Sequence, residues 1–213
     1  MSFRRAIIFS GGALSPDDWS EIGEGDLIIG ADRGALYLVE HGIRPDIAVG
    51  DFDSILPEQK QQVEAYSSRI LSCDPVHKDL TDTELALELA IGEQIGEVLL
   101  LGATGTRMDH TLANLQMLLR AMQHHIHCVI QDAHNRIMLT GTEAVVEDRG
   151  YTYISLLPMT TEVTGINLEG FMYPLVNATL KMGQSRGVSN RLVAPSGKVS
   201  IESGMLLIIQ SRD

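Results

Sequence analysis

The sequence lacks several features that mark other classes of protein. Its 213 residues contain only two cysteines, Cys73 and Cys128, in no metal-ligand spacing, so we expect reduced thiols rather than a disulfide framework. No apolar run approaches the ~20 residues that span a bilayer. The apolar run after Arg4 and Arg5 is too short for a secretory signal peptide. These absences favour a cytoplasmic protein that does not enter a membrane.

Positive charge is also scarce. The chain has 16 Lys and Arg residues against 28 Asp and Glu residues, which gives a net charge of −12. A surface this acidic repels DNA, RNA and anionic membranes, so we expect no nucleic-acid partner. An anionic substrate such as a nucleotide would need local help from a metal ion, basic side chains or backbone N–H groups.

Two common nucleotide-binding motifs are absent. There is no G-x-G-x-x-G, and the Gly-rich segment 102–107 lacks the Gly-Lys-Ser/Thr of a P-loop. The sequence therefore does not favour a P-loop NTPase or a Rossmann dehydrogenase. His124, His125 and His127 come at the end of a predicted helix without companion Cys or carboxylate ligands, so we expect a solvated helix terminus there.

The first two thirds of the chain repeat an order of strand and helix. Helix-like stretches include residues 83–91 and 111–122, and Thr81 with Glu84 forms a capping-box pattern. The apolar runs between them are continuous, as expected of strands buried on both faces: residues 6–9, 27–29, 47–49, 70–71, 98–101 and 128–130. This order predicts an α/β fold with a mostly parallel, doubly wound sheet.

After about Thr140 the helical periodicity stops. Short β-type runs follow instead, separated by Gly, Pro, Asn and Ser, at residues 151–157, 163–168, 179–181, 198–201 and 205–209. We therefore predict two domains, an α/β domain over residues 1–142 and a small antiparallel β domain over residues 143–213.

Polar and glycine residues follow the predicted strands. In open α/β sheets, ligands bind beyond the carboxyl ends of the strands. Five such strand ends carry glycine, carboxylate or basic residues, at residues 10–12, 30–34, 50–54, 74–82 and 102–110. This convergence is stronger evidence for an active site than any one motif.

The acidic residues at these ends suit a divalent cation. Residues two apart in an extended segment point the same way, so Asp51 and Asp53 can present both carboxylates to one ion. Hard oxygen ligands, shared with phosphate oxygens, suit Mg²⁺. Because Asp32, Asp79 and Asp82 lie at neighbouring strand ends, the pattern predicts a site for Mg²⁺ and a polyphosphate.

Simpler interpretations exist for some of these residues. A carboxylate at Asp79, Asp82 or Asp109 can merely satisfy the N–H groups at a helix N-terminus. Arg107 can be a solvated surface residue, although its position after a Gly-rich turn favours a bidentate contact with phosphate.

The motifs resemble those of the thiamine pyrophosphokinase family over nearly the whole chain. The residues that carry the resemblance are 31–35, Pro45-Asp46, 50–54, 79–82, 102–110, Asn114, 155–158, Gly165, Gly170, 173–175 and Ser189-Asn190. The resemblance implies an N-terminal α/β domain and a C-terminal β-sandwich domain. It also implies a homodimer whose active site forms between the α/β domain of one subunit and the β domain of the other.

The resemblance further implies a reaction and roles for residues. With Mg²⁺, pyrophosphate would pass from ATP to the hydroxyl of thiamine, giving thiamine diphosphate and AMP. Asp51, Asp53 and Asp82 would hold the metal and the pyrophosphate, with Asp79 nearby. Ser189 and Asn190 would contact thiamine. The nucleotide side would comprise Asp32, Arg33, Thr104, Arg107, Asp109, His110 and Asn114.

Two departures from the family pattern and two competing hypotheses remain. The family usually has Gly in place of Arg33 and often an acidic residue in place of Arg191.

A nucleotide-sugar glycosyltransferase would also use Asp-x-Asp with a divalent metal. A nucleotide- or thiamine-sensing module would bind its ligand tightly without releasing AMP.

Overall fold

The structure is a computed structural model that describes residues 5–72 and 80–213. It divides into two compact units, Met1–Ala133 and His134–Asp213. The predicted boundary between residues 142 and 143 falls inside the second unit, between its first two strands. Cys73 and Asp79 lie outside the described residues.

The sheet of the first unit has six strands, and all of its pairings are parallel. Its strands are β1 (Ala6–Phe9), β2 (Leu27–Ala31), β3 (Ile47–Gly50), β4 (Ile70–Ser72), β5 (Glu97–Leu101) and β6 (His127–Gln131). Their order is β4-β3-β2-β1-β5-β6. The chain therefore winds outward from β1 to β4, returns to β5 and continues to β6, so the direction of winding reverses between β1 and β5.

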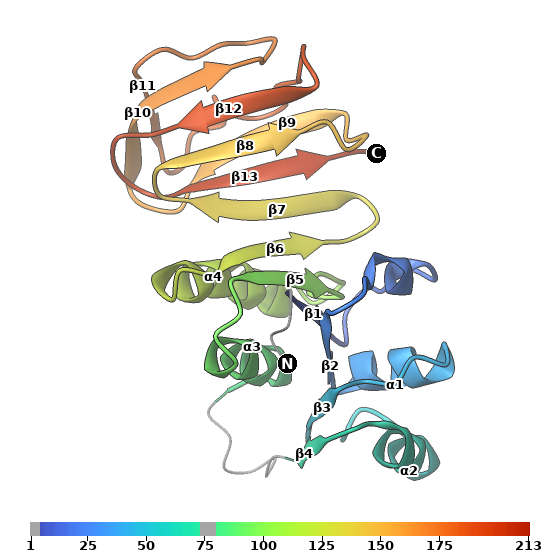
Figure 1. The fold of residues 1–213 in the computed structure, drawn as a ribbon. Coiled ribbons are helices and arrows are strands. Elements are labelled where there is room, and N and C mark those ends of the chain that lie inside the picture. The colour runs from blue at the N-terminus through green and yellow to red at the C-terminus, as the bar shows by residue number, and fades with distance from the viewer. Residues whose placement is uncertain (1–4, 73–79) are drawn as a thin grey trace. The chain divides into compact units, whose positions relative to one another are not determined.

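Helices cover both faces of this sheet (Figure 1). The 3-10 helix η1 (Asp18–Glu21) and the helices α1 (Arg33–Glu40), α2 (Pro57–Tyr66), α3 (Asp82–Gly92) and α4 (Met108–Gln123) connect its strands. The pair α1 and α2 lies on one side, and the pair α3 and α4 lies on the other, as right-handed crossovers require. All four residues of β1 are fully buried, which explains why the strands are continuous apolar runs. The predicted doubly wound sheet is confirmed.

The helix starts agree partly with the sequence patterns. The Thr81 hydroxyl accepts a hydrogen bond from the backbone N–H of Glu84 at 3.2 Å, so the predicted N-cap of α3 is confirmed. Helix α4 begins at Met108, earlier than the predicted start near Thr111, so Asp109 lies in its first turn and is not its N-cap. Among residues 5–72 and 80–213, no helix has both the length and the apolar character needed to cross a bilayer.

The second unit consists of two antiparallel sheets. Its strands are β7 (Asn135–Thr140), β8 (Glu143–Glu147), β9 (Tyr153–Pro158), β10 (Glu162–Glu169), β11 (Ala178–Lys181), β12 (Ser196–Ser200) and β13 (Leu206–Ser211). One sheet contains β7-β13-β9 and the other has the order β11-β10-β12-β8. A Cβ on Gly187 would lie 2.4 Å from the Leu156 carbonyl of β9 and 3.0 Å from the Leu180 side chain of β11, so this glycine packs where the sheets meet. The predicted antiparallel β domain is confirmed.

Candidate active site

A cavity of about 600 Å³ opens at the carboxyl ends of the strands in the first unit. Its wall is formed by residues 10–13 after β1, 31–33 between the end of β2 and the start of α1, 102–107 after β5 and 81–83 at the start of α3, with Ser54, His110, Thr111 and Asn114. It therefore surrounds the point between β1 and β5 where the winding reverses, which is where doubly wound sheets bind ligands. Its volume is within the range of small-molecule sites.

Part of the wall consists of two backbone segments that pair closely. The N–H of Gly12 donates to the carbonyl of Gly102 at 2.8 Å, and that of Ala13 donates to the carbonyl of Thr104 at 2.7 Å. A Cβ on Gly12 would lie only 2.2 Å from the Thr104 oxygen, so this approach requires glycine. A ligand in the cavity thus meets main chain at this wall.

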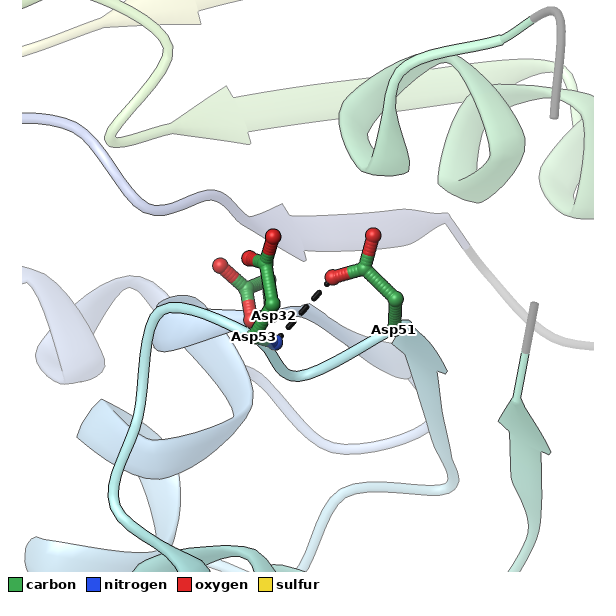
Figure 2. Close-up of side chains that lie close together, drawn as sticks. All are labelled: Asp32, Asp51 and Asp53. Atoms are coloured by element: carbon green, nitrogen blue, oxygen red, sulfur yellow. Dashed lines mark hydrogen bonds between the residues drawn. The ribbon is translucent and has the colours of Figure 1, made fainter. Parts of the chain in front are cut away.

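Three carboxylates lie beside the cavity. Asp32, Asp51 and Asp53 each offer one oxygen, and these oxygens lie within 4.8 Å of one another. Figure 2 shows the three side chains close together. Asp51 and Asp53 come from the loop after β3, and Asp32 is the residue that precedes α1. Asp32 and Asp51 are half-buried, and Asp53 is exposed. The structure therefore brings together the predicted Asp51 and Asp53 with Asp32.

The backbone at Phe52 explains how Asp51 and Asp53 come together. Phe52 has φ 58°, a left-handed conformation that costs a bulky residue about 1–3 kcal/mol. The bend lets the N–H of Asp53 donate to Oδ1 of Asp51 at 3.1 Å. The segment is thus bent, whereas the sequence pattern suggested an extended one. The Phe52 side chain is 3% exposed and packs in an apolar cluster with Ala35 and Val63.

Asp32 is the residue that joins the cluster to the cavity wall. Its Oδ2 accepts a hydrogen bond from the Ser54 hydroxyl, and its Oδ1 is buried without a hydrogen-bond partner in the described structure. Burial raises the pKa of this carboxyl, and the charges of Asp82 and Asp51 raise it further, against the lowering effect of Ser54. A buried, unsatisfied carboxylate oxygen next to other carboxylates suits a cation ligand.

Asp82 faces the same region from α3. A Cβ built on Gly50 would lie 3.2 Å from Oδ1 of Asp82 and 3.4 Å from Cβ of Asp32. Gly50 also has φ 144°, so both its conformation and its close neighbours favour glycine. The absence of a side chain at this position lets Asp82 and Asp32 approach the same point.

Basic side chains also contribute to the wall. Arg107 forms an exposed ion pair with Asp109, with 2.5 Å between Nη2 and Oδ2, and this holds the pKa of Asp109 at about 2. The wall includes Arg107 and His110 but not Asp109. Arg33 is exposed, and its Cβ lies 3.4 Å from the point that a Cβ on Gly11 would occupy. Its stem therefore lies against the loop after β1.

Two polar residues hold the loop after β5. The buried Asn114 donates from Nδ2 to the carbonyl of Ala103 at 2.6 Å. Thr104 donates from its hydroxyl to Oδ2 of Asp132 at 2.7 Å. Both residues line the cavity. The motifs predicted a place for them on the nucleotide side, and that role stays a prediction.

Two profiles of one family match the chain in sequence order. Residues 20–130 match the family described as "Thiamin pyrophosphokinase, catalytic domain", and residues 143–206 match "Thiamin pyrophosphokinase, vitamin B1 binding domain". The chain belongs to the thiamine pyrophosphokinase family.

Individual members of the thiamine pyrophosphokinase family are similar in sequence and in structure. A thiamine pyrophosphokinase of Bacillus subtilis (strain 168) is 34% identical over 202 residues, which is 94% of each chain. A crystal structure of thiamine pyrophosphokinase from Bacillus subtilis superposes with a TM-score of 0.90 at 33% identity, over 98% of this chain and 100% of that one. Thiamin pyrophosphokinase from Candida albicans, at 19% identity, shares the fold with a TM-score of 0.79 over 99% of this chain and 90% of that one.

The thiamine pyrophosphokinase motif residues of the second unit have different environments. Asn190 is buried, and its Oδ1 accepts from the N–H groups of Tyr173 and Arg191 at 3.0 and 2.8 Å. Its Nδ2 donates to the carbonyl of Tyr173 at 2.8 Å. Ser189 is exposed with φ 62°, and its N–H donates to the Ser155 hydroxyl at 3.1 Å. The guanidinium carbon Cζ of Arg191 lies 5.0 Å from the centre of the Tyr153 ring.

Some residues of the cavity wall were not predicted as site residues from the sequence. Ser54 and Thr81 are adjacent to the predicted carboxylates, and that adjacency was the available signal. Ser10 is 1% exposed, and its hydroxyl has no hydrogen-bond partner in the described structure. Ser10 follows β1 directly, so its position at a strand end was a signal for a site residue. A serine, however, was not a residue type that suggested a metal or phosphate ligand.

Proposed function

We propose that the protein transfers the pyrophosphoryl group of ATP to the hydroxyl of thiamine, giving thiamine diphosphate and AMP. The observation that carries this proposal is that Asp32 belongs both to a cluster of oxygen ligands and to the wall of a nucleotide-sized cavity. A polyphosphate bound there would lie beside its cation. Membership of the thiamine pyrophosphokinase family supports the choice of thiamine as the acceptor.

The carboxylates are proposed to hold Mg²⁺. Asp51, Asp53 and Asp82 are the proposed ligands together with the pyrophosphate oxygens, and Asp32 is close enough to join them. The buried, unpartnered Oδ1 of Asp32 supports this fit. Asp79 is proposed to lie near the metal, although it is outside the described residues. A bound Mg²⁺ would neutralise charge on the phosphate oxygens as it develops in the transition state.

The nucleotide is proposed to lie along the loop after β5. Arg33 and Arg107 would contact phosphate oxygens, and the backbone at Thr104 would form part of the wall. His110 is close to Arg107 in the wall, whereas Asp109 would act by orienting the Arg107 guanidinium. Asn114 would contribute by fixing the Ala103 carbonyl.

The chemical step is proposed to be an in-line displacement. The thiamine hydroxyl oxygen forms a bond to the β-phosphorus of ATP, and the bond from that phosphorus to the oxygen shared with the α-phosphorus breaks. AMP leaves with that oxygen, and the β- and γ-phosphates stay on thiamine. The hydroxyl proton passes to a carboxylate of the site or to solvent, with Asp82 as the proposed acceptor.

Thiamine is proposed to be held by the second unit of a partner subunit in a cytoplasmic homodimer. Ser189 has an exposed side chain and is the proposed direct contact. The amide of Asn190 already binds three backbone groups, so its proposed contribution is to shape the Ser189 turn, with one N–H left for the ligand.

Product analysis tests the function. ATP, thiamine and Mg²⁺ with the purified protein should yield AMP and thiamine diphosphate in equal amounts. ADP would contradict pyrophosphoryl transfer, and tight binding of ATP or thiamine with no AMP would favour a sensing module.

Light scattering should give twice the chain mass of 23.3 kDa if the homodimer is correct.

A further inference from the structure

Lys60 of α2 contacts the loop that carries two of the carboxylates, which we call the acidic loop (residues 51–54). Its ammonium group donates to the carbonyl oxygen of Asp51 at 3.3 Å. The same group lies 5.5 Å from the centre of the Phe52 ring. Lys60 is half-buried, so its charge is partly removed from water at this contact. One side chain thus binds both residues that begin the bend of the acidic loop.

The bend needs such support because Phe52 is left-handed. A residue of this size at φ 58° stays there only where its surroundings fix it. The Phe52 side chain is fixed by an apolar cluster that includes Val63 of α2. Lys60 and Val63 are three residues apart and share a face of α2. The helix therefore holds the Phe52 side chain through Val63 and the loop backbone through Lys60.

The position of Lys60 is itself fixed by the start of α2. The N–H of Leu56 donates to Oε1 of Gln59 at 2.9 Å, and the N–H of Lys60 donates to the carbonyl of Leu56 at 2.9 Å. The first turn of α2 is thus closed at the end of the acidic loop. The ammonium group of Lys60 reaches back from this turn to Asp51, across the segment that connects β3 and α2.

We propose that Lys60 is a positioning residue for divalent-metal binding. It holds the acidic loop in its bent form before the cation arrives, so that the carboxylates of Asp51 and Asp53 are already gathered. This inference rests on the proposed metal site, but it concerns a residue outside that site. Lys60 would touch neither ATP nor thiamine.

Electrostatics alone predicts the opposite effect, which makes the inference testable. A positive charge near a cation site repels the cation, so removal of the ammonium group should strengthen metal binding if repulsion dominates. Removal should weaken metal binding if the ordering of the acidic loop dominates. The sign of the change in affinity therefore distinguishes the two roles.

The experiment measures Mn²⁺ binding to the full-length protein by the electron paramagnetic resonance signal of free Mn²⁺. Lys60→Met keeps an unbranched apolar side chain on α2 and removes the ammonium group. We expect it to weaken Mn²⁺ binding about tenfold, as the loss of one charge-assisted hydrogen bond implies. Lys60→Arg, which keeps the charge and the donors, should stay within about twofold of wild type. Gln62→Met, at an exposed position of the same helix, is the matched control and should bind like wild type.

A second readout separates positioning from general stability. The Mg²⁺ concentration for half-maximal activity should rise about tenfold in Lys60→Met, while kcat at saturating Mg²⁺ falls less than about threefold. Equal or tighter Mn²⁺ binding by a folded Lys60→Met protein would overturn the inference and leave the metal site standing. Wild-type protein that binds no Mn²⁺ in the absence of ATP would also overturn the inference, because the carboxylates would then need the phosphate oxygens to bind the cation. If Lys60→Met fails to fold, Lys60→Gln with a thermal-unfolding control replaces it.

Discussion

The Ser54 hydroxyl donates a hydrogen bond to Oδ2 of Asp32 and so links the acidic loop to the residue that precedes α1. The bond lowers the pKa of the Asp32 carboxyl, but burial has the larger effect and raises it. The site therefore keeps a carboxylate in surroundings that disfavour its charge. Such a group costs stability in the metal-free protein and favours the binding of a cation.

The stability cost of Asp32 should depend on pH. Because its pKa in the folded protein is above the ordinary value of 3.8, the charged carboxylate destabilises the fold at neutral pH. Asp32→Asn should raise the midpoint of thermal unfolding at pH 7 in the presence of a chelator. The gain should shrink as pH falls through the folded-state pKa, and it should vanish below 3.8, where the carboxyl is protonated in both states. An equal gain at pH 3 and pH 7 would contradict this cause.

Removal of the Ser54 hydroxyl should change the pH dependence of activity. Ser54→Ala deletes the hydrogen bond that lowers the pKa of Asp32, so that pKa should rise further. If the reaction requires the charged form of Asp32, the acid limb of the pH profile of kcat/KM should move to higher pH. Ser54→Thr keeps a hydroxyl and should leave the limb near its wild-type position. A limb that moves equally in both variants would exclude the hydroxyl as the cause.

Loss of one proposed metal ligand should remove most of the activity. Asp51→Asn keeps the side-chain shape and the acceptor for the Asp53 N–H but removes the negative charge. We expect AMP formation to fall by about 10²-fold or more, while the thermal-unfolding midpoint stays near that of wild type. Glu64→Gln, at an exposed position of α2, removes one negative charge away from the site and is the control. Near-wild-type turnover by Asp51→Asn would remove this residue from the metal site.

The sequence could predict which strand ends carry the site, because parallel strands all end at one edge of the sheet. It could not predict how Asp51 and Asp53 converge. In the extended segment that we expected, the two side chains would point the same way because they are two residues apart. In the structure the left-handed backbone at Phe52 bends the segment and brings the two carboxylates together. That bend depends on the packing of Phe52 against residues of α1 and α2, and such long-range packing leaves no local signal. The 1% exposure of Ser10 likewise has no signal in the residues next to it.

The second unit shows a similar limit. Short apolar runs predicted five of its seven strands, but they did not mark β7 and β8, which come where the helical periodicity ends. The motif Ser189-Asn190 was predicted to contact thiamine through both residues. In the structure the Asn190 amide binds the backbone of Tyr173, 17 residues away in sequence, and the N–H of its neighbour Arg191. The contact with Tyr173 depends on how the chain folds, so it could not be predicted from the motif.

Arg33 should contribute to ATP binding through its charge. Arg107 is already paired with Asp109, whereas Arg33 is exposed in the wall beside Asp32. Arg33→Gly should raise KM for ATP by about tenfold with a smaller change in kcat, because a phosphate contact is lost in the ground state as well as in the transition state. Arg33→Lys should recover part of the loss. The effect should weaken as ionic strength rises. An unchanged KM at low ionic strength would place the Arg33 side chain away from the phosphates.

Asn190 should be needed mainly for the stability of the second unit. Asn190→Ala leaves the N–H groups of Tyr173 and Arg191 and the carbonyl of Tyr173 without this partner. Because an unsatisfied buried group costs about 1–3 kcal/mol, we expect a lower denaturant midpoint at unchanged slope. Ser189→Ala is the matched comparison, since its exposed side chain should affect KM for thiamine without affecting the midpoint. If Asn190→Ala is as stable as wild type and only KM for thiamine rises, Asn190 acts on the ligand and not on the turn.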